Sequence, residues 1–180
     1  LEIIRKKGII FDMDKKQIIK FQIISTIFIF IFGTILHFTY EWSGENTIVG
    51  LFSATNESTW EHLKLLFFPM IITTIVGYFY VGRNILNYFC AESKGIIIAL
   101  TFIVVFFYTY TGVIGRNFAF LDIGSFFVAV ILGKYISYKN YFSKVKCNKK
   151  VAIGLLILLG IMFIIFTYFP PNIGLFISPV

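Results

Sequence analysis

The densest polar chemistry of this sequence lies in residues 56–64, which read NESTWEHLK. Two carboxylates, an imidazole, an indole and an ammonium group stand together there, within a chain made largely of Ile, Phe, Leu and Val. Imidazole and carboxylate groups serve as general acids and bases and as metal ligands. The segment therefore raises the question of whether it forms a working site or only begins a helix at a membrane surface.

A helix start accounts for every polar residue of this segment. Ser58 and Glu61 have the spacing of a capping box, in which hydroxyl and carboxylate bind free backbone N–H groups, and Asn56 is an alternative cap. Glu57 and Glu61 suit the positive end of a helix dipole. In this interpretation Trp60 lies in the aromatic belt of a membrane, and Lys64 extends toward the headgroups.

A working site is favoured by the polar residues that we expect at the same membrane depth. His37 and Glu41 are four residues apart, on one face of a predicted helix, and Arg116 and Asn117 form a predicted turn. Asp122 lies inside a predicted span, where an ionisable group costs about 2.5–3.5 kcal/mol, so we expect Arg116, Lys64 or His37 as its partner. The predicted polar cluster comprises His37, Glu41, Asn56, Glu57, Trp60, Glu61, His62, Lys64, Arg116 and Asp122.

A metal site is one interpretation of this cluster. His37, Glu61 and Asp122, with Glu41 as a further donor, offer nitrogen and oxygen ligands for Zn²⁺ or Mn²⁺. No local motif such as HExxH supports it, and the catalytic residues of any enzyme here are unknown. A helix that begins at Asn56 places Glu57 beside Glu61, whereas a helix that begins at Ser58 leaves Glu57 outside it. The alternatives are a hydrogen-bonded structural layer and a binding cleft for a small ligand or lipid headgroup.

The composition predicts a membrane protein. Hydrophobic residues make up 58% of the 180 residues and charged residues only 14%, with a mean hydropathy of +0.85. A soluble domain needs about a quarter of its residues charged. We therefore expect lipid to surround most of this chain. The basic residues lie at the ends of apolar runs rather than along a groove, which argues against nucleic-acid binding despite a net charge of +7.

Five apolar runs are long enough to cross a bilayer as helices, which takes about 20 residues each. They cover residues 18–40, 63–82, 95–115, 118–137 and 151–170. The second run contains Pro69, which a membrane helix tolerates. The third and fourth runs predict a tight antiparallel hairpin, in which Gly112 and Gly115 allow close approach. The fold class is thus an all-α bundle of five transmembrane helices.

The distribution of Lys and Arg predicts the orientation. Residues 1–20, 83–94 and 134–150 hold 14 basic and 4 acidic residues, a net charge of +10, whereas the rest holds 2 basic and 5 acidic residues, a net charge of −3. The positive-inside rule makes the first group cytoplasmic, with the amino terminus inside and the carboxyl terminus outside. We divide the chain into a basic segment, 1–17, and a membrane domain, 18–180. Cys90 and Cys147 fall on the reducing side and are expected to be free thiols.

Several segments resemble a family of small bacterial multi-pass membrane proteins of unknown function. They are HFxYxWSG from His37, VGxF from Val49, NESTWEHLK with the later Pro69, and FTYxPP from Phe166. The resemblance covers the chain from about Phe21 and implies about five membrane helices and no assigned activity. In such relatives the chain continues a little past the equivalent of Pro179. Separately, Leu1 is an unusual first residue, so the natural start is expected either at Met13 or at an alternative initiation codon.

These observations lead to one principal functional hypothesis and two alternatives. The first is a binding or accessory role in the bacterial cytoplasmic membrane, with an outward cleft that recognises a ligand, a headgroup or a partner protein. The second is a metal-dependent hydrolase of lipid-linked substrates, with Glu61 as ligand or base and His37, His62 and Asp122 assisting. The third is a subunit of a small transporter. In all three hypotheses the protein lies in the bilayer, and all three are compatible with a homo-oligomer.

Overall fold

The chain forms an all-helical bundle, in a computed structural model that describes residues 2–143, 145 and 147–179, with side chains from residue 15 onward. The long helices are α1 (Glu2–Trp42), α3 (Thr59–Tyr80), α4 (Tyr88–Ile114), α5 (Ala119–Tyr141) and α6 (Lys149–Tyr168). Short elements complete it, namely α2 (Thr47–Gly50), η1 (Gly82–Asn84) and η2 (Gly174–Phe176). No strand occurs in the described part of the chain.

The prediction of five membrane helices is confirmed. Five helices are long and apolar enough to cross a bilayer, beginning with residues 15–42 of α1. The first helix begins at Glu2 rather than at residue 18. The other helix boundaries differ from the predicted ones by up to seven residues, most at the start of α4 (predicted at 95, observed at Tyr88). The basic amino-terminal segment is not separate in backbone structure, because α1 runs unbroken from Glu2 to Trp42.

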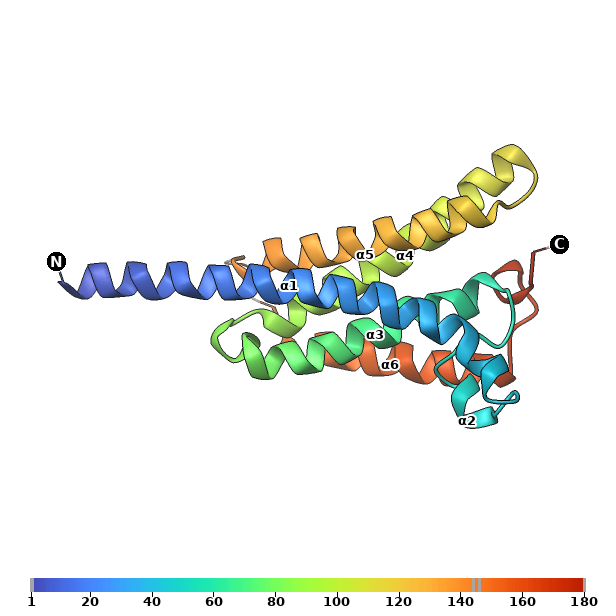
Figure 1. Cartoon of the computed structure of the whole chain (residues 1–180), viewed down its shortest axis with the longest axis horizontal. Helices are drawn as coiled ribbons and strands as arrows, with labels where there is room; N and C mark the ends of the chain where they lie inside the picture. Colours follow the sequence, from blue (N-terminus) through green and yellow to red (C-terminus); the bar gives the residue numbers. More distant parts are fainter. Residues whose placement is uncertain (1, 144, 146, 180) are drawn as a thin grey trace.

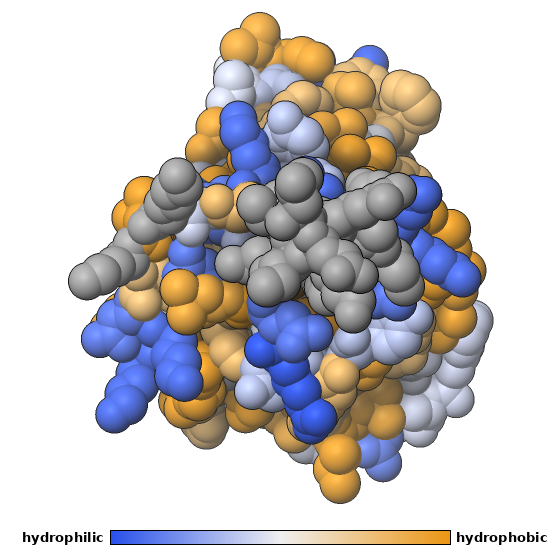
Figure 2. Space-filling view, turned by 90° about the vertical axis from the view of Figure 1, so that its left-hand side faces the viewer, coloured by the Kyte–Doolittle hydropathy of each residue, from blue (hydrophilic) through white to orange (hydrophobic). Residues whose placement is uncertain are grey.

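The bundle has two chemically different ends (Figure 1). At one end, here called the lysine end, lie residues 15–22, the α3–α4 connection and the α5–α6 connection, so that the three basic segments of the sequence share it. Figure 2 looks onto this end and shows hydrophilic side chains distributed over it, with hydrophobic ones around the outside. At the other, the histidine end, lie residues 37–62, the α4–α5 turn and the carboxyl-terminal segment.

The α4–α5 hairpin forms as expected, but its close approach does not occur at the predicted glycines. Gly115 ends α4 with φ of 83°, a left-handed conformation that glycine adopts without strain. A β-carbon built on Gly112 would meet no heavy atom within 4 Å, whereas one built on Gly95 would lie 2.4 Å from the Gly133 carbonyl oxygen. The two helices therefore touch at Gly95 and Gly133, near the lysine end, and the expectation for Gly112 was wrong.

Pro69 determines how α1 crosses α3. A proline cannot donate to the carbonyl four residues earlier, so Pro69 leaves the Leu65 carbonyl without its helical partner. Gly33 of α1 lies against this oxygen, and a β-carbon built there would be 2.6 Å from it and 2.7 Å from the ring of Phe126. The absence of a side chain at Gly33 thus lets α1, α3 and α5 meet at one point.

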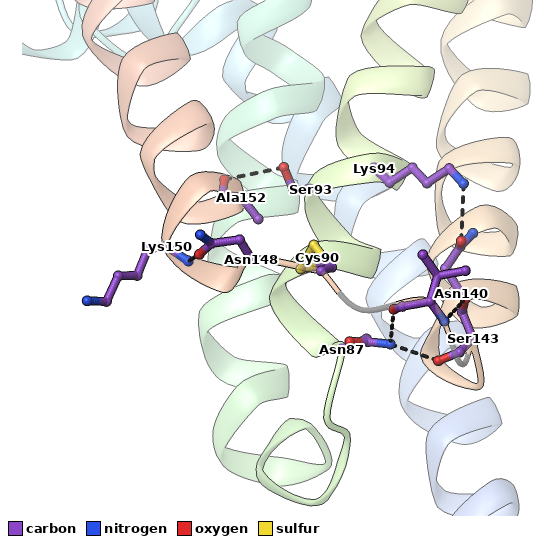
Figure 3. The surroundings of a disulfide bond; sticks show 11 residues. Asn87, Cys90, Ser93, Lys94, Asn140, Ser143, Asn148, Lys150 and Ala152 are labelled. Carbon is purple, nitrogen blue, oxygen red and sulfur yellow. Dashed lines mark hydrogen bonds between the residues drawn. A yellow bond between two sulfur atoms is a disulfide. The ribbon is translucent and has the colours of Figure 1, made fainter.

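The cysteines are joined, contrary to the expectation of free thiols. Cys90 and Cys147 form a disulfide that links the first turn of α4 to the segment before α6 (Figure 3). Nearby, the Asn87 side chain donates hydrogen bonds to the carbonyl oxygens of Ser143 and Val145, at 2.7 and 3.2 Å. Sequence spacing gave no sign of the pairing, because 57 residues separate the two cysteines and only the antiparallel path of α4 and α5 brings them together.

Candidate functional site at the histidine end

The start of α3 decides which residues of NESTWEHLK can form a site. Ser58 caps the helix, with its hydroxyl oxygen accepting from the Glu61 N–H at 3.4 Å, and the Asn56 side chain accepts from the Ser58 N–H at 2.9 Å. Glu61 does not reach back to Ser58, so only half of the predicted capping box forms. Glu57 lies before the helix, and the alternative with Glu57 and Glu61 on one helical face is not the one observed.

Outside the helix, Glu57 joins both histidines of the chain. The Nε2 atoms of His37 and His62 are 3.2 Å apart, and Glu57 Oε2 lies 3.4 Å from the Nε2 of His62 and 3.9 Å from that of His37. Among the described residues these three form the group of His, Cys, Asp and Glu side chains whose ligand atoms all lie within 4.8 Å of one another. We call them the histidine cluster.

Hydrogen bonding fixes the tautomer of His62. Its Nδ1 lies 2.9 Å from the carbonyl oxygen of Ser58, and because a carbonyl can only accept, Nδ1 carries the proton. In the neutral ring Nε2 then has a free lone pair, which faces His37 and the Glu57 carboxylate. A neutral His37 with its proton on Nε2 can donate a hydrogen bond to this lone pair, and a cation between the ligand atoms can take the place of that proton.

A cavity of about 600 Å³ opens beside the histidine cluster. Helices α4 and α5 diverge from α1 and α3 toward the histidine end (Figure 1). The residues that line the cavity come from all four of these helices. Its ionisable and amide lining consists of the cluster, Asn117 and Asp122, and the hydroxyl residues Thr34, Thr59 and Ser125 also line it. Its apolar lining includes Leu65, Ile103, Phe107, Phe126 and Phe127, most of which lie deeper along their helices. The cavity thus has a polar end and an apolar body.

Glu61 and Lys64 form a closed pair on the other side of α3. Lys64 Nζ lies 2.6 Å from Glu61 Oε2, and both side chains are buried, with exposed fractions of 0% and 2%. Lys64 also donates to the Gly50 carbonyl and to Thr167, and the Thr55 N–H and hydroxyl donate to Glu61. Lys64 therefore does not extend toward headgroups as expected. It holds the α1–α3 connection and α6 onto α3.

Trp60 is part of the core rather than of an aromatic belt. Its ring packs against Phe163, Phe166 and Phe176, with centroids 4.5–5.6 Å apart, and it is 6% exposed. Phe176 comes from η2, so the segment after α6 folds back over the end of α3. The prediction for Trp60 rested on the average preference of tryptophan for the membrane interface. The segment after α6 covers this ring and buries it instead.

The other predicted site residues have separate surroundings. Asp122 accepts a hydrogen bond from the Tyr110 hydroxyl, not from Arg116, Lys64 or His37. Arg116 lies over the ring of Phe118, 4.7 Å from its centroid. Glu41 is exposed near the end of α1, and Asn56 is exposed beside the α3 cap. Of the predicted metal ligands His37, Glu61 and Asp122, His37 belongs to the histidine cluster, while Glu61 and Asp122 bind other side chains.

Sequence reasoning missed a buried polar network at the lysine end. Glu92 is fully buried, lies 3.2 Å from Lys134 Nζ, and accepts hydrogen bonds from the Tyr141 and Thr74 hydroxyls. Gln22 of α1 donates to Tyr141 at 2.7 Å. A signal existed: Glu92 and Tyr141 are equally far along the chain from the turn at 116–117, so a tight hairpin places them at one depth.

Residues 12–180 match a family of unknown function, DUF6512, and the chain belongs to this family. Neither the curated proteins nor the solved structures yield a match. Membership in this family assigns no activity to the chain.

Proposed function

We propose that this protein binds an amphiphilic molecule of the bilayer in the cavity at the histidine end. The observation that carries the proposal is the cavity's combination of an apolar body with a polar end. Its volume of about 600 Å³ lies within the range of about 300–1,000 Å³ found for small-molecule sites. An acyl chain would lie along the apolar lining, and the polar group would reach the histidine cluster, Asn117 and Asp122.

The order of the lining residues along the helices supports this placement. On α1 Gly33 lies one turn deeper than His37, and on α5 Phe126 lies one turn deeper than Asp122. On α3 Leu65 lies about one turn deeper than His62. The contact at Gly33 and Phe126 closes the cavity toward the middle of the bundle. Polarity thus decreases with depth, as it does along a lipid from headgroup to chain.

The cavity also reaches the surface that faces lipid. Three of its lining residues, Phe38, Ile123 and Phe127, are 43%, 59% and 37% exposed on the isolated chain. All three are apolar and belong to membrane-spanning helices, so bilayer molecules are their natural neighbours. An amphiphile could therefore enter sideways from the membrane between α1 and α5.

The proposed location is a bacterial cytoplasmic membrane, with the lysine end inside and the cavity opening outward. The charge difference of +10 against −3 supports this orientation. One observation opposes it: the Cys90–Cys147 disulfide lies at the lysine end, and disulfides are rare in reducing compartments. We give more weight to the charges, because three separate basic segments agree and the bias of Lys and Arg determines membrane orientation.

Filling the cavity tests the binding proposal. Thr34→Trp places an indole in the lining, and Ile131→Trp, at a 56% exposed position of α5 outside the lining, is the matched control. Native mass spectrometry of the full chain, loaded with phosphatidylethanolamine or phosphatidylglycerol, measures the bound lipid. We expect Thr34→Trp to lower occupancy at least fivefold and Ile131→Trp to leave it unchanged. Equal occupancy in both variants would contradict the proposal.

Single cysteines test the orientation. In a Cys90→Ser, Cys147→Ser background, Glu45→Cys marks the histidine end and Leu86→Cys, at a position 96% exposed, marks the lysine end. A maleimide that cannot cross the membrane should label the first variant in intact cells and the second only after lysis. The reverse pattern would overturn the orientation and place the disulfide in an oxidising compartment.

A further inference from the structure

We infer that His37, Glu57 and His62 bind a divalent transition metal ion, with Zn²⁺ as the best fit, and leave one coordination position open to the cavity. Two imidazoles and one carboxylate are the ligand set of catalytic zinc sites, which keep a fourth position for water or substrate. This differs from the metal site expected from the sequence, because Glu57 and His62 replace Glu61 and Asp122.

The orientation of His62 is the first observation that points to a metal. Metal-binding histidines almost always donate their second ring N–H to a carboxylate, a backbone carbonyl or water, which fixes the ring and the tautomer. His62 Nδ1 donates in this way to the Ser58 carbonyl at 2.9 Å. Ser58 itself is held as the cap of α3. The lone pair of Nε2 is thereby aimed at the other two members of the cluster before any ion binds.

The size of the cluster is the second observation. Metal–ligand distances of about 2.0–2.1 Å and tetrahedral angles require neighbouring ligand atoms to be about 3.3 Å apart. Two of the three separations agree, at 3.2 Å between the imidazoles and 3.4 Å between His62 and Glu57. The third, 3.9 Å between His37 and Glu57, needs only a small rotation of a side chain that is 66% exposed. An ion at the centre would replace the proton between the two Nε2 atoms and could be bound by all three side chains.

The position of the cluster determines what the fourth ligand is. All three members line the cavity, and His37 and His62 are each only 32% exposed, so the ion would sit at the polar end of the cavity. One carboxylate leaves a divalent ion with one unit of positive charge, which favours an anionic oxygen from a phosphate or carboxylate group. In the absence of such a group, water would occupy the position.

This inference deepens the proposed function, because it identifies what would hold the polar group of the amphiphile. Metal binding as such does not require an amphiphile, since all three ligands belong to the chain. The two statements therefore fail separately. If the cluster binds metal but the cavity binds no lipid, the proposed function is refuted and the metal site stands. If the cavity binds lipid but the cluster binds no metal, only the metal site is refuted.

The test is titration of the chelator-treated full chain in detergent with Co²⁺, followed by competition with Zn²⁺. We expect about one equivalent of Co²⁺, absorption typical of tetrahedral or five-coordinate Co²⁺, and displacement by Zn²⁺. His37→Ala, His62→Ala and Glu57→Gln should each weaken binding at least tenfold. Glu45→Gln, an exposed carboxylate at the same end but outside the cluster, should leave affinity unchanged.

A ligand exchange separates coordination from a structural role of the histidines. His62→Cys retains a metal ligand and should add a thiolate-to-Co²⁺ charge-transfer band, whereas His62→Gln should lose binding. Gel filtration of each variant checks that the fold persists. Equal Co²⁺ affinity in the wild type and the three ligand variants, or a Co²⁺ spectrum unaltered in His62→Cys, would overturn the metal site.

Discussion

The two ends of the bundle treat buried polar groups in opposite ways. At the lysine end, the Glu92 carboxylate is enclosed by Lys134 and Tyr141 of α5 and Thr74 of α3, and nothing of it is exposed. At the histidine end, His37, Glu57 and His62 face one another beside a cavity of about 600 Å³, and the Nε2 atoms of the two imidazoles lie 3.2 Å apart. The Glu92 carboxylate has its partners within the chain and stabilises the fold. The histidine cluster can instead bind an ion from outside the chain.

The Glu61–Lys64 pair shows that the end of the bundle at which a polar group lies does not by itself determine whether all its partners come from the chain. It lies at the histidine end, in the same segment as the cluster, yet it is closed by Thr55, Gly50 and Thr167. Glu57 and Glu61 are four residues apart in the sequence, but Glu57 lies before the helix with its side chain 66% exposed, whereas Glu61 lies within it with its side chain 2% exposed. Within NESTWEHLK, one carboxylate therefore fixes the fold and the other is free to serve a site.

The largest expected effect is on the closed network of the lysine end. Lys134→Met leaves the Glu92 carboxylate buried without its cation, and breaking a buried pair in this way costs about 3–5 kcal/mol. The free energy of unfolding, measured by titration with sodium dodecyl sulfate in mixed micelles, should fall by that amount. Lys139→Met, at an exposed position on the same helix, is the matched control and should change it by less than about 0.5 kcal/mol.

A double variant sharpens this prediction. In Glu92→Gln, Lys134→Met the uncompensated charge is gone, so stability should recover part of the loss seen with Lys134→Met alone. If Lys134→Met is no less stable than Lys139→Met, the lysine-end network contributes nothing to stability and the contrast between the two ends is lost.

Next in size is the disulfide, which fastens the same end. Cys90→Ser with Cys147→Ser opens a loop of 57 residues and should lower the free energy of unfolding by about 2–4 kcal/mol. Treatment of the unaltered chain with reductant should produce the same loss, which serves as the control for packing changes. If reductant does not change the free energy of unfolding, the disulfide either does not form or does not stabilise the chain.

A smaller effect is expected where three helices meet below the cavity. Gly33→Ala places a methyl group 2.6 Å from the Leu65 carbonyl oxygen, and relieving such overpacking costs about 1–3 kcal/mol. Gly112→Ala meets no neighbour and should be neutral or stabilise by up to about 1 kcal/mol. Comparable losses in the two variants, again in mixed-micelle unfolding, would refute the assigned crossing point.

The sequence predicted the number of helices and the end at which the histidines gather, because hydropathy and charge act over whole segments. It did not predict the closed networks. Their members, such as Glu92 with Lys134, or Lys64 with Thr167, are far apart in sequence and meet only through the register of packed helices. Glu57 was recognised as a candidate, but its role depends on whether the helix begins at Asn56 or at the Ser58 cap, and a single sequence leaves that boundary open.

The most direct test of the account compares His62→Ala with Lys134→Met in two measurements, the Co²⁺ affinity and the free energy of unfolding of the metal-free chain. The account predicts that His62→Ala loses at least tenfold in Co²⁺ affinity while its stability changes by less than about 1 kcal/mol. Lys134→Met should keep its Co²⁺ affinity and lose about 3–5 kcal/mol. A His62→Ala variant that binds Co²⁺ normally but unfolds as readily as Lys134→Met would contradict it, because both ends would then be structural.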